Sequence, residues 1–252
     1  MLNWKHLDKT YIYDNTFEGL LTIVFLVFET KVKPVKIISK ENFTPTLIDN
    51  VEEITTDLNK SERVFNGILK TMSEKTLYYI FTAFLSFNPE KEINILEYII
   101  LGFKHGPNID NMLTFDSVLF IQKLAKQVGY EVQRFRGFVR FTKISNDLFY
   151  SKICPDNNVL ELVGKFFTNR LSNENFIIHD EKRNIAFLYS KSNYTIVDAS
   201  NLQIPECSHE EILYKQLWKT FFKSIAINER RNSRLQLSFM PKRYWKNIFE
   251  TE

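Results

Sequence analysis

Apolar positions follow a period of two in some stretches of the chain and a period near 3.6 in others, which predicts both strands and helices. Residues 10–14 predict a short strand, and Asn15 with Glu18 three positions later is typical of a helix start. That helix is expected to run to about Lys31 and to be buried on more than one side, because its sequence is apolar all round. Pro34 precedes a second strand at 35–38, so the pattern predicts a parallel strand–helix–strand crossover.

The middle of the chain is predicted to be helical, and the part after residue 135 to contain a sheet. Helical periodicity with capping residues predicts helices at 58–72, 73–87, 91–105 and 114–130. Alternation then predicts strands at 138–143, 148–153, 176–179, 184–189 and 194–197, with a helix at 158–170. We therefore expect an α+β fold, with an antiparallel sheet and a covering helix after the helical region. The parts 1–135 and 136–252 are expected to form two domains or one compact unit.

A long amphipathic helix is expected from about residue 209 to 231. Four apolar residues recur at every fourth position and, joined by Trp218 and Phe222, predict a buried stripe: Leu213, Leu217, Phe221 and Ile225. Lys215, Lys219 and Lys223 form a second row that is expected to face outward. Such a row suits a phosphate backbone, because neutralising phosphates releases counterions. The alternative is a solvated face that keeps the protein in solution.

Positive charge is concentrated at the C-terminal end of the chain. The net charge is only +3, but residues 215–252 contain nine Lys or Arg and three Asp or Glu, an excess of 9 − 3 = 6. This segment includes a basic tail around Pro241 in which cations alternate with aromatic residues. A clustered basic and aromatic segment indicates nucleic acid as the partner.

The candidate nucleic-acid contacts are the cations and rings of this segment, with a second basic patch near residue 135. Seven cations are expected to hold phosphates: Lys219, Lys223, Arg230, Arg231, Arg234, Lys242 and Arg243. Tyr244 or Trp245 would stack on an unpaired base; alternatively, these two rings and Phe239 anchor the segment in the core. Arg134 and Arg136 form the second patch, whose alternative is a core strand.

Four polar residues at the ends of predicted strands are the candidates for catalysis. His179 and Asp180 end one strand, Arg183 follows three residues later, and Asp14 ends the first strand. Histidine beside a carboxylate can carry out acid–base chemistry. The alternative is structural: Asp180 closes an Asx turn, His179 is packed and hydrogen-bonded, and Asp14 belongs to a helix cap.

Other classes of function find no support in the sequence. Two distant cysteines and four scattered histidines predict neither a disulfide framework nor a metal or iron–sulfur site. The chain contains no P-loop, GxGxxG, HExxH or GxSxG motif, and no cofactor is indicated. The N-terminus is unlike a signal peptide, and the most apolar run, at about nine residues, is too short to span a bilayer. We therefore expect a cytoplasmic protein without a membrane partner.

Six motifs in the same chain resemble a bacterial family of DNA metabolism and DNA repair proteins. They are YDNTFEGLL at 13–21, RFRGFVRF at 134–141, IIHDEKR at 177–183, LWKTFFKSI at 217–225, ERRN at 229–232 and FMPKRYW at 239–245. The resemblance implies a genomic partnership with a radical-SAM protein of DNA modification or repair. It also implies a related module fused ahead of a uracil-DNA-glycosylase-type domain. The family has no assigned reaction, so the resemblance assigns no catalytic residue.

Three hypotheses for the function remain open at this point. The first is a DNA-binding accessory protein that acts with the radical-SAM enzyme, whose cluster the partner would supply. The second is a base- or backbone-processing enzyme that flips a nucleotide into a pocket near Asp14, His179, Asp180 and Arg183. The third is a protein–protein scaffold that does not contact nucleic acid.

Overall fold

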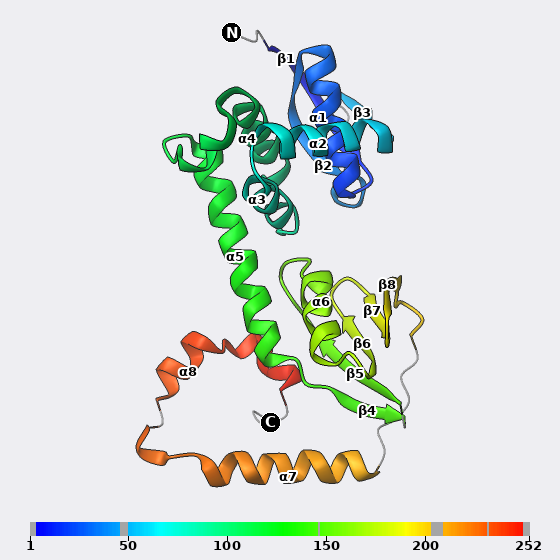
Figure 1. Cartoon of the computed structure of the whole chain (residues 1–252), viewed down its shortest axis with the longest axis vertical. Coiled ribbons are helices and arrows are strands. Elements are labelled where there is room, and N and C mark those ends of the chain that lie inside the picture. Colours follow the sequence, from blue (N-terminus) through cyan, green and yellow to red (C-terminus); the bar gives the residue numbers. More distant parts are fainter. Residues whose placement is uncertain (1–3, 46–49, 146, 203–208, 231, 249–252) are drawn as a thin grey trace. The chain divides into compact units, whose positions relative to one another are not determined.

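A computed structural model describes residues 4–45, 50–145, 147–202, 209–230 and 232–248 of the chain. The chain divides into two compact units, Met1–Gly129 and Tyr130–Glu252. Helix α5 (Asp116–Phe138) runs from the first unit into the second (Figure 1). Helices and two sheets together confirm the predicted α+β class.

The first unit is built on the predicted parallel crossover. Strand β1 (Lys5–Tyr13) pairs in parallel with β2 (Val32–Ser39), and helix α1 (Phe17–Thr30) connects them. Leu20, Ile23 and Val24 of α1 are fully buried, as its all-apolar sequence predicts. Strand β3 (Val51–Glu53) pairs with the other side of β1. No alternation marks β3 in the sequence, because it has three residues and two of them are acidic.

The start of α1 differs from the prediction by one residue. Thr16 is the N-cap, and its hydroxyl accepts a hydrogen bond from the Gly19 amide at 2.9 Å. Asn15, the predicted cap, instead adopts a left-handed conformation with φ of 62°. Asn tolerates this conformation better than most residues, so it fits the bend between β1 and the cap. The predicted pairing of Asn15 with Glu18 as a capping box is therefore wrong.

The remaining helices of the first unit lie close to their predicted positions, with one extension. They are α2 (Leu58–Thr71), α3 (Glu74–Phe84) and α4 (Lys91–His105), with the short 3-10 helices η1 (Lys40–Asn42) and η2 (Gly106–Asn111). Helix α5 continues to Phe138 instead of ending at 130. Phe135 and Val139 are both buried and lie four residues apart, so helical spacing persists where the sequence also resembles a strand.

The second unit contains a five-stranded mixed sheet in which consecutive strands are neighbours. Its strands are β4 (Thr142–Ser145), β5 (Leu148–Ile153), β6 (Asn175–Asp180), β7 (Ile185–Ser190) and β8 (Asn193–Asp198). The prediction of a wholly antiparallel sheet is corrected at one pair, because β5 and β6 are parallel. Helix α6 (Leu160–Arg170) supplies the crossover that a parallel pair requires, and it packs on the buried face of the sheet.

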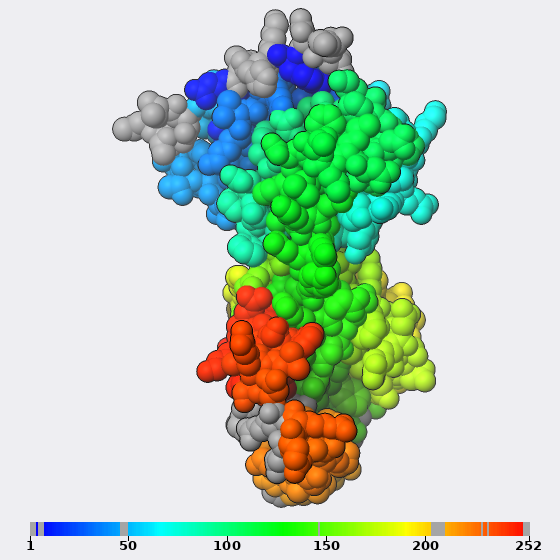
Figure 2. Space-filling view, turned by 90° about the vertical axis from the view of Figure 1, so that its left-hand side faces the viewer, coloured from blue at the N-terminus to red at the C-terminus, as the bar shows by residue number. Residues whose placement is uncertain are grey.

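The C-terminal segment consists of helix α7 (His209–Ile225), η3 (Asn228–Arg230), α8 (Ser233–Phe239) and η4 (Lys242–Asn247). Figure 2 shows α7 and α8 on the surface in orange and red. The predicted buried stripe of α7 is wrong, because Leu217, Phe221 and Ile225 are all exposed. An amphipathic pattern shows that a helix face favours apolar cover, but it does not show that the cover belongs to the same chain.

Candidate nucleic-acid interface

The end of the basic tail is an anchor in the second unit. Tyr244 is only 5% exposed, and its ring packs against Phe135 and Phe138 with centroid distances of 5.2 and 5.5 Å. Burial raises the pKa of Tyr244, so its hydroxyl stays protonated and donates to Glu131 at 3.3 Å. Of the two roles considered for this ring, the structure shows the anchor. A ring packed in this way has no face open to a base.

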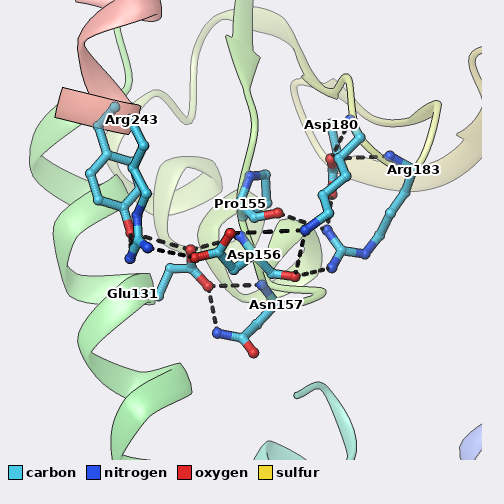
Figure 3. A network of polar contacts seen from close by, with 9 residues as sticks. Glu131, Pro155, Asp156, Asn157, Asp180, Arg183 and Arg243 are labelled. Carbon is cyan, nitrogen blue, oxygen red and sulfur yellow. Dashed lines mark hydrogen bonds and ion pairs between the residues drawn. The ribbon is translucent and has the colours of Figure 1, made fainter. Parts of the chain in front are cut away.

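Glu131, on α5, organises this anchor (Figure 3). Its carboxylate is 3% exposed and accepts hydrogen bonds from the backbone amides of Asp156 and Asn157 at 2.8 and 2.9 Å. It also accepts from the Asn157 side chain at 2.6 Å and from Tyr244. One buried carboxylate therefore joins α5, the loop after β5 and the C-terminal η4.

Two cations of the tail are paired with carboxylates of the same unit. The Arg243 guanidinium lies 2.9 Å from a carboxylate oxygen of Asp156, and Lys246 lies 3.1 Å from Glu181. Arg243 also donates to the Tyr244 hydroxyl at 3.1 Å. A phosphate would have to displace these carboxylates, so Arg243 is placed to hold the tail rather than to meet a ligand.

Asp180 and Arg183 come together, but they serve the turn between β6 and β7. The Asp180 carboxylate is 0% exposed and accepts from the backbone amides of Lys182 and Arg183 at 3.0 and 3.3 Å. Its other oxygen lies 2.9 Å from the Arg183 guanidinium. Arg183 also donates to the carbonyls of Pro155 and Asp156. The Asx-turn alternative is therefore the one that the structure shows (Figure 3).

His179 does not join Asp180, because neighbouring residues of a strand point to opposite faces of the sheet. Its Nδ1 atom lies 2.9 Å from the hydroxyl of Tyr150 on the adjacent strand β5. Burial lowers the pKa of His179, and this effect outweighs the opposing attraction of Glu181. The ring is thus held as a neutral, hydrogen-bonded side chain.

We expect the His179 ring to titrate with a midpoint below its ordinary value of 6.5, because burial disfavours the charged imidazolium. The ring is then neutral at pH 7 and gains a proton only in more acidic solution. An NMR titration of the ring Cε1 proton, assigned with a His179→Gln variant, measures this midpoint. A value at or above 6.5 would contradict the burial of the ring.

Asp14 lies in the first unit and fixes the bend between β1 and α1. Its carboxylate accepts from the Thr16 hydroxyl at 2.6 Å and from the Thr56 hydroxyl at 2.7 Å. Burial alone would raise the pKa of Asp14, but these hydrogen bonds outweigh it and hold the pKa below its ordinary value. Asp14 thus has the structural role considered as the alternative to catalysis, because it bonds Thr16, the residue that caps α1. The four predicted catalytic candidates are thus divided between two units, and the structure brings only Asp180 and Arg183 into contact.

The second basic patch lies on the last turns of α5 rather than on a strand. Arg136 is half-buried, and its guanidinium lies over the Phe166 ring at 4.9 Å from the centroid. Arg134 is also half-buried and lies beside Tyr244. Both cations take part in packing within the second unit, which makes them weaker candidates for phosphate contacts than fully exposed cations.

The exposed cations of this segment include one each in α7, η3, α8 and the start of η4. Lys223, Arg230, Arg234 and Lys242 are exposed, and Lys219 is half-buried. Arg231 lies outside the described residues. Trp245 is half-buried, and its indole nitrogen donates to the Met240 carbonyl of the same segment at 2.9 Å.

Several rings of this segment are exposed where the sequence predicted burial. Trp218 and Phe222 were expected in the buried stripe, and Phe239 in the alternative core anchor, but all three are exposed, as is Tyr214. Aromatic residues in an amphipathic helix are usually buried. One signal in the sequence indicated this exposure. Large apolar residues are distributed around much of α7, and a single packed face cannot bury all of them. We call the exposed cations and rings from α7 to Lys242 the α7–α8 surface.

Two negative findings apply to the described residues. No three His, Cys, Asp or Glu side chains of the described ranges gather in a way that could hold a metal ion. None of the helices in those ranges has both the length and the apolar character that crossing a bilayer requires.

The fold and surface define a two-unit α+β protein whose C-terminal segment is open, basic and aromatic. The chain belongs to the DUF4130 family, a domain of unknown function whose sequence model matches residues 89–250. The match covers the last helices of the first unit and nearly all of the second unit, including the α7–α8 surface. No curated protein matches the chain.

Proposed function

We propose that this protein is a DNA-binding accessory protein of DNA repair or DNA modification that acts beside a radical-SAM enzyme. The observation that carries the proposal is the α7–α8 surface, on which cations and aromatic rings are exposed together. The motif resemblance supports the DNA and radical-SAM parts of the proposal. The iron–sulfur cluster and the radical chemistry then belong to the partner, and this chain supplies binding to DNA.

The sequence of this surface has a clear excess of positive charge. From the start of α7 at residue 209 to residue 248 the chain has nine Lys or Arg and three acids, Glu210 and Glu211 in the first turn of α7 and Glu229. Arg243 and Lys246 are paired with carboxylates. The proposed phosphate contacts are therefore the exposed cations Lys223, Arg230, Arg234 and Lys242, with the half-buried Lys219 beside them. Each phosphate neutralised releases counterions, so binding through these residues depends steeply on salt.

A titration of DNA affinity against salt concentration tests the proposal. We expect the logarithm of the affinity for a fluorescent oligonucleotide, measured by anisotropy, to fall linearly with the logarithm of the salt concentration. Replacing Lys219, Lys223, Arg230 and Arg234 together by Gln should make the slope of this plot shallower by about 3. Each lost phosphate contact removes about 0.7 to 0.9 from the steepness of the slope.

The matched control replaces four exposed lysines of the first unit by Gln: Lys36, Lys70, Lys75 and Lys123. This variant loses the same charge and should keep the original slope. DNA binding that does not weaken with salt, or equal slopes for the two quadruple variants, would count against the proposal.

A scaffold that binds only protein is the second candidate, and one observation favours it. The row Leu213, Leu217, Phe221 and Ile225 is exposed, and apolar patches of this kind often mark protein-binding sites. Co-expression with the radical-SAM partner followed by a pull-down, with and without damaged DNA, separates the two candidates. Copurification that is unaffected by DNA, together with no DNA retention at low salt, would favour the scaffold.

The structure offers no support for the enzyme hypothesis as the sequence posed it. Asp180 and Arg183 are committed to the turn after β6, and His179 is held by Tyr150 on the opposite side of the strand. Asp14 serves the bend of the first unit. We therefore propose binding, and not a reaction, for this chain.

A further inference from the structure

Helix α7 carries three parallel rows of side chains, each with a step of four residues. The first row, called the aliphatic row although it includes the ring of Phe221, contains Leu213, Leu217, Phe221 and Ile225. The ring row contains Tyr214, Trp218 and Phe222, and the ammonium row contains Lys215, Lys219 and Lys223. Successive rows are one residue apart in sequence and therefore about 100° apart around the helix. The ring row thus lies between the aliphatic row and the ammonium row.

All members of the ring row are open. Tyr214 is 67% exposed, and Trp218 and Phe222 are each 43% exposed. This exposure distinguishes them from Tyr244, whose ring is packed between Phe135 and Phe138. Trp218 also contacts Phe221, with ring centroids 5.7 Å apart and the ring planes tilted by 38°.

The spacing along the helix distinguishes a single strand from a duplex. Four residues of α-helix rise about 6 Å, so neighbouring members of each row are about 6 Å apart along the axis. Nucleotides of a duplex strand are spaced by only about 3.4 Å along its axis. A strand that follows α7 must therefore be stretched to nearly twice the duplex spacing, which separates its bases from one another.

We infer that α7 binds single-stranded DNA, with bases stacked on the ring row and phosphates along the ammonium row. The inference rests on the proposed DNA binding and adds the form of DNA and the residues that select it. Each ring offers a face to one unpaired base, and the lysines three residues before Trp218 and Phe222 lie beside those rings. In a duplex the bases are paired inside the helix, so the rings have nothing to stack on.

Charge complementarity favours a polyanion as the occupant of this face. The ammonium row is followed by Arg230, Arg234 and Lys242, and after the two acids of the first turn of α7 the single acid up to residue 248 is Glu229. An anionic membrane would also attract these cations, but it requires no register between rings and ammonium groups. The matched step of the ring row and the ammonium row is what a chain of alternating bases and phosphates requires.

Two neighbouring phenylalanines of α7 provide the test, because only one of them belongs to the ring row. Phe222 is in the ring row, whereas Phe221, at 51% exposed, is in the aliphatic row. Leucine keeps the apolar character and a high helix propensity but removes the ring. The full-length variants Trp218→Leu, Phe222→Leu and Phe221→Leu are measured against an unstructured 20-nucleotide strand, the same strand annealed to its complement, and phosphatidylserine-containing vesicles.

We expect the single strand to bind at least about tenfold more tightly than the duplex. Trp218→Leu and Phe222→Leu should each weaken single-strand binding by about tenfold, and Phe221→Leu by less than about twofold. The circular dichroism spectrum of each variant should match that of the parent protein. A matching spectrum shows that weaker binding does not result from unfolding.

The possible failures lead to different conclusions. If no form of DNA binds, the proposed function fails and this inference fails with it. Equal affinity for strand and duplex overturns the inference while the proposed function stands, and so does a Phe221→Leu loss as large as that of Phe222→Leu. Tight vesicle binding with DNA affinity unchanged in the ring variants would assign this face to a membrane instead.

Discussion

Replacing Glu131 by alanine is expected to lower the free energy of unfolding by about 4 kcal/mol. The carboxylate accepts hydrogen bonds from two backbone amides and from the side chains of Asn157 and Tyr244, all in a buried site. Alanine leaves the amides of Asp156 and Asn157 without their acceptor, and an unsatisfied buried donor costs about 1–3 kcal/mol. Urea unfolding followed by circular dichroism measures the loss.

Glu161→Ala is the matched control for this prediction. Glu161 pairs with Lys165 four residues later on α6, and both side chains are substantially exposed. Exposed helical pairs contribute about 0.3–0.5 kcal/mol, so this variant should stay close to the parent. Faster hydrogen exchange at the amides of Asp156 and Asn157 should accompany the loss in Glu131→Ala. Similar stabilities for the two variants would show that the buried carboxylate does not hold the C-terminal anchor.

Local patterns predicted the parts of the fold that depend on neighbouring residues in the sequence. The crossover of β1, α1 and β2 follows from a strand pattern, an all-apolar helix and a second short strand. Ser73 was a predicted cap, and its hydroxyl accepts from the Thr76 amide at 3.0 Å. Such features are set within one or two turns of chain, where spacing and side-chain chemistry determine the outcome.

Features that depend on distant contacts could not be predicted in the same way. The alternating pattern of β5 and β6 is compatible with either a parallel or an antiparallel neighbour. The helix predicted at 158–170 between the two strands was the one local signal for their parallel pairing, and the prediction of an antiparallel sheet did not use it. Glu131 resembles any charged residue of a surface helix until the loop at Asp156 and the ring of Tyr244 close around it. Its burial therefore has no signal in the sequence.

The candidate interface shows the same division. Charge counting located the basic segment, and the structure leaves Lys223, Arg230 and Arg234 exposed there. The charge count could not show that the end of the tail, where Arg243 pairs with Asp156, differs from the exposed part of the segment. The difference arises because Tyr244 is drawn into the core by Phe135 and Phe138, and this packing positions its neighbour Arg243 beside a carboxylate. Composition alone treats the two ends of the segment alike.

Two glycines in helices are expected to respond to alanine with opposite signs, although helix propensity favours alanine at both. At Gly164 of α6, a Cβ atom would lie 2.5 Å from the Cγ and Cε2 atoms of Phe187. That ring is fully buried between Phe176 and Tyr194, with centroids 6.1 and 4.8 Å away, so it has little room to move. We expect Gly164→Ala to lower the free energy of unfolding by about 2–3 kcal/mol, since overpacking outweighs the gain in propensity.

At Gly129 of α5 no atom lies within 4 Å of the added Cβ, so Gly129→Ala gains the propensity without a clash. We expect it to raise the free energy of unfolding by about 0.5–1 kcal/mol. Thermal and urea unfolding of the two variants beside the parent measure both shifts. Stabilisation by both substitutions would mean that α6 does not approach β7 as closely as the contact of Gly164 with Phe187 requires. Because that contact sets how α6 covers the sheet, the pair of variants tests the packing of the unit that carries the proposed interface.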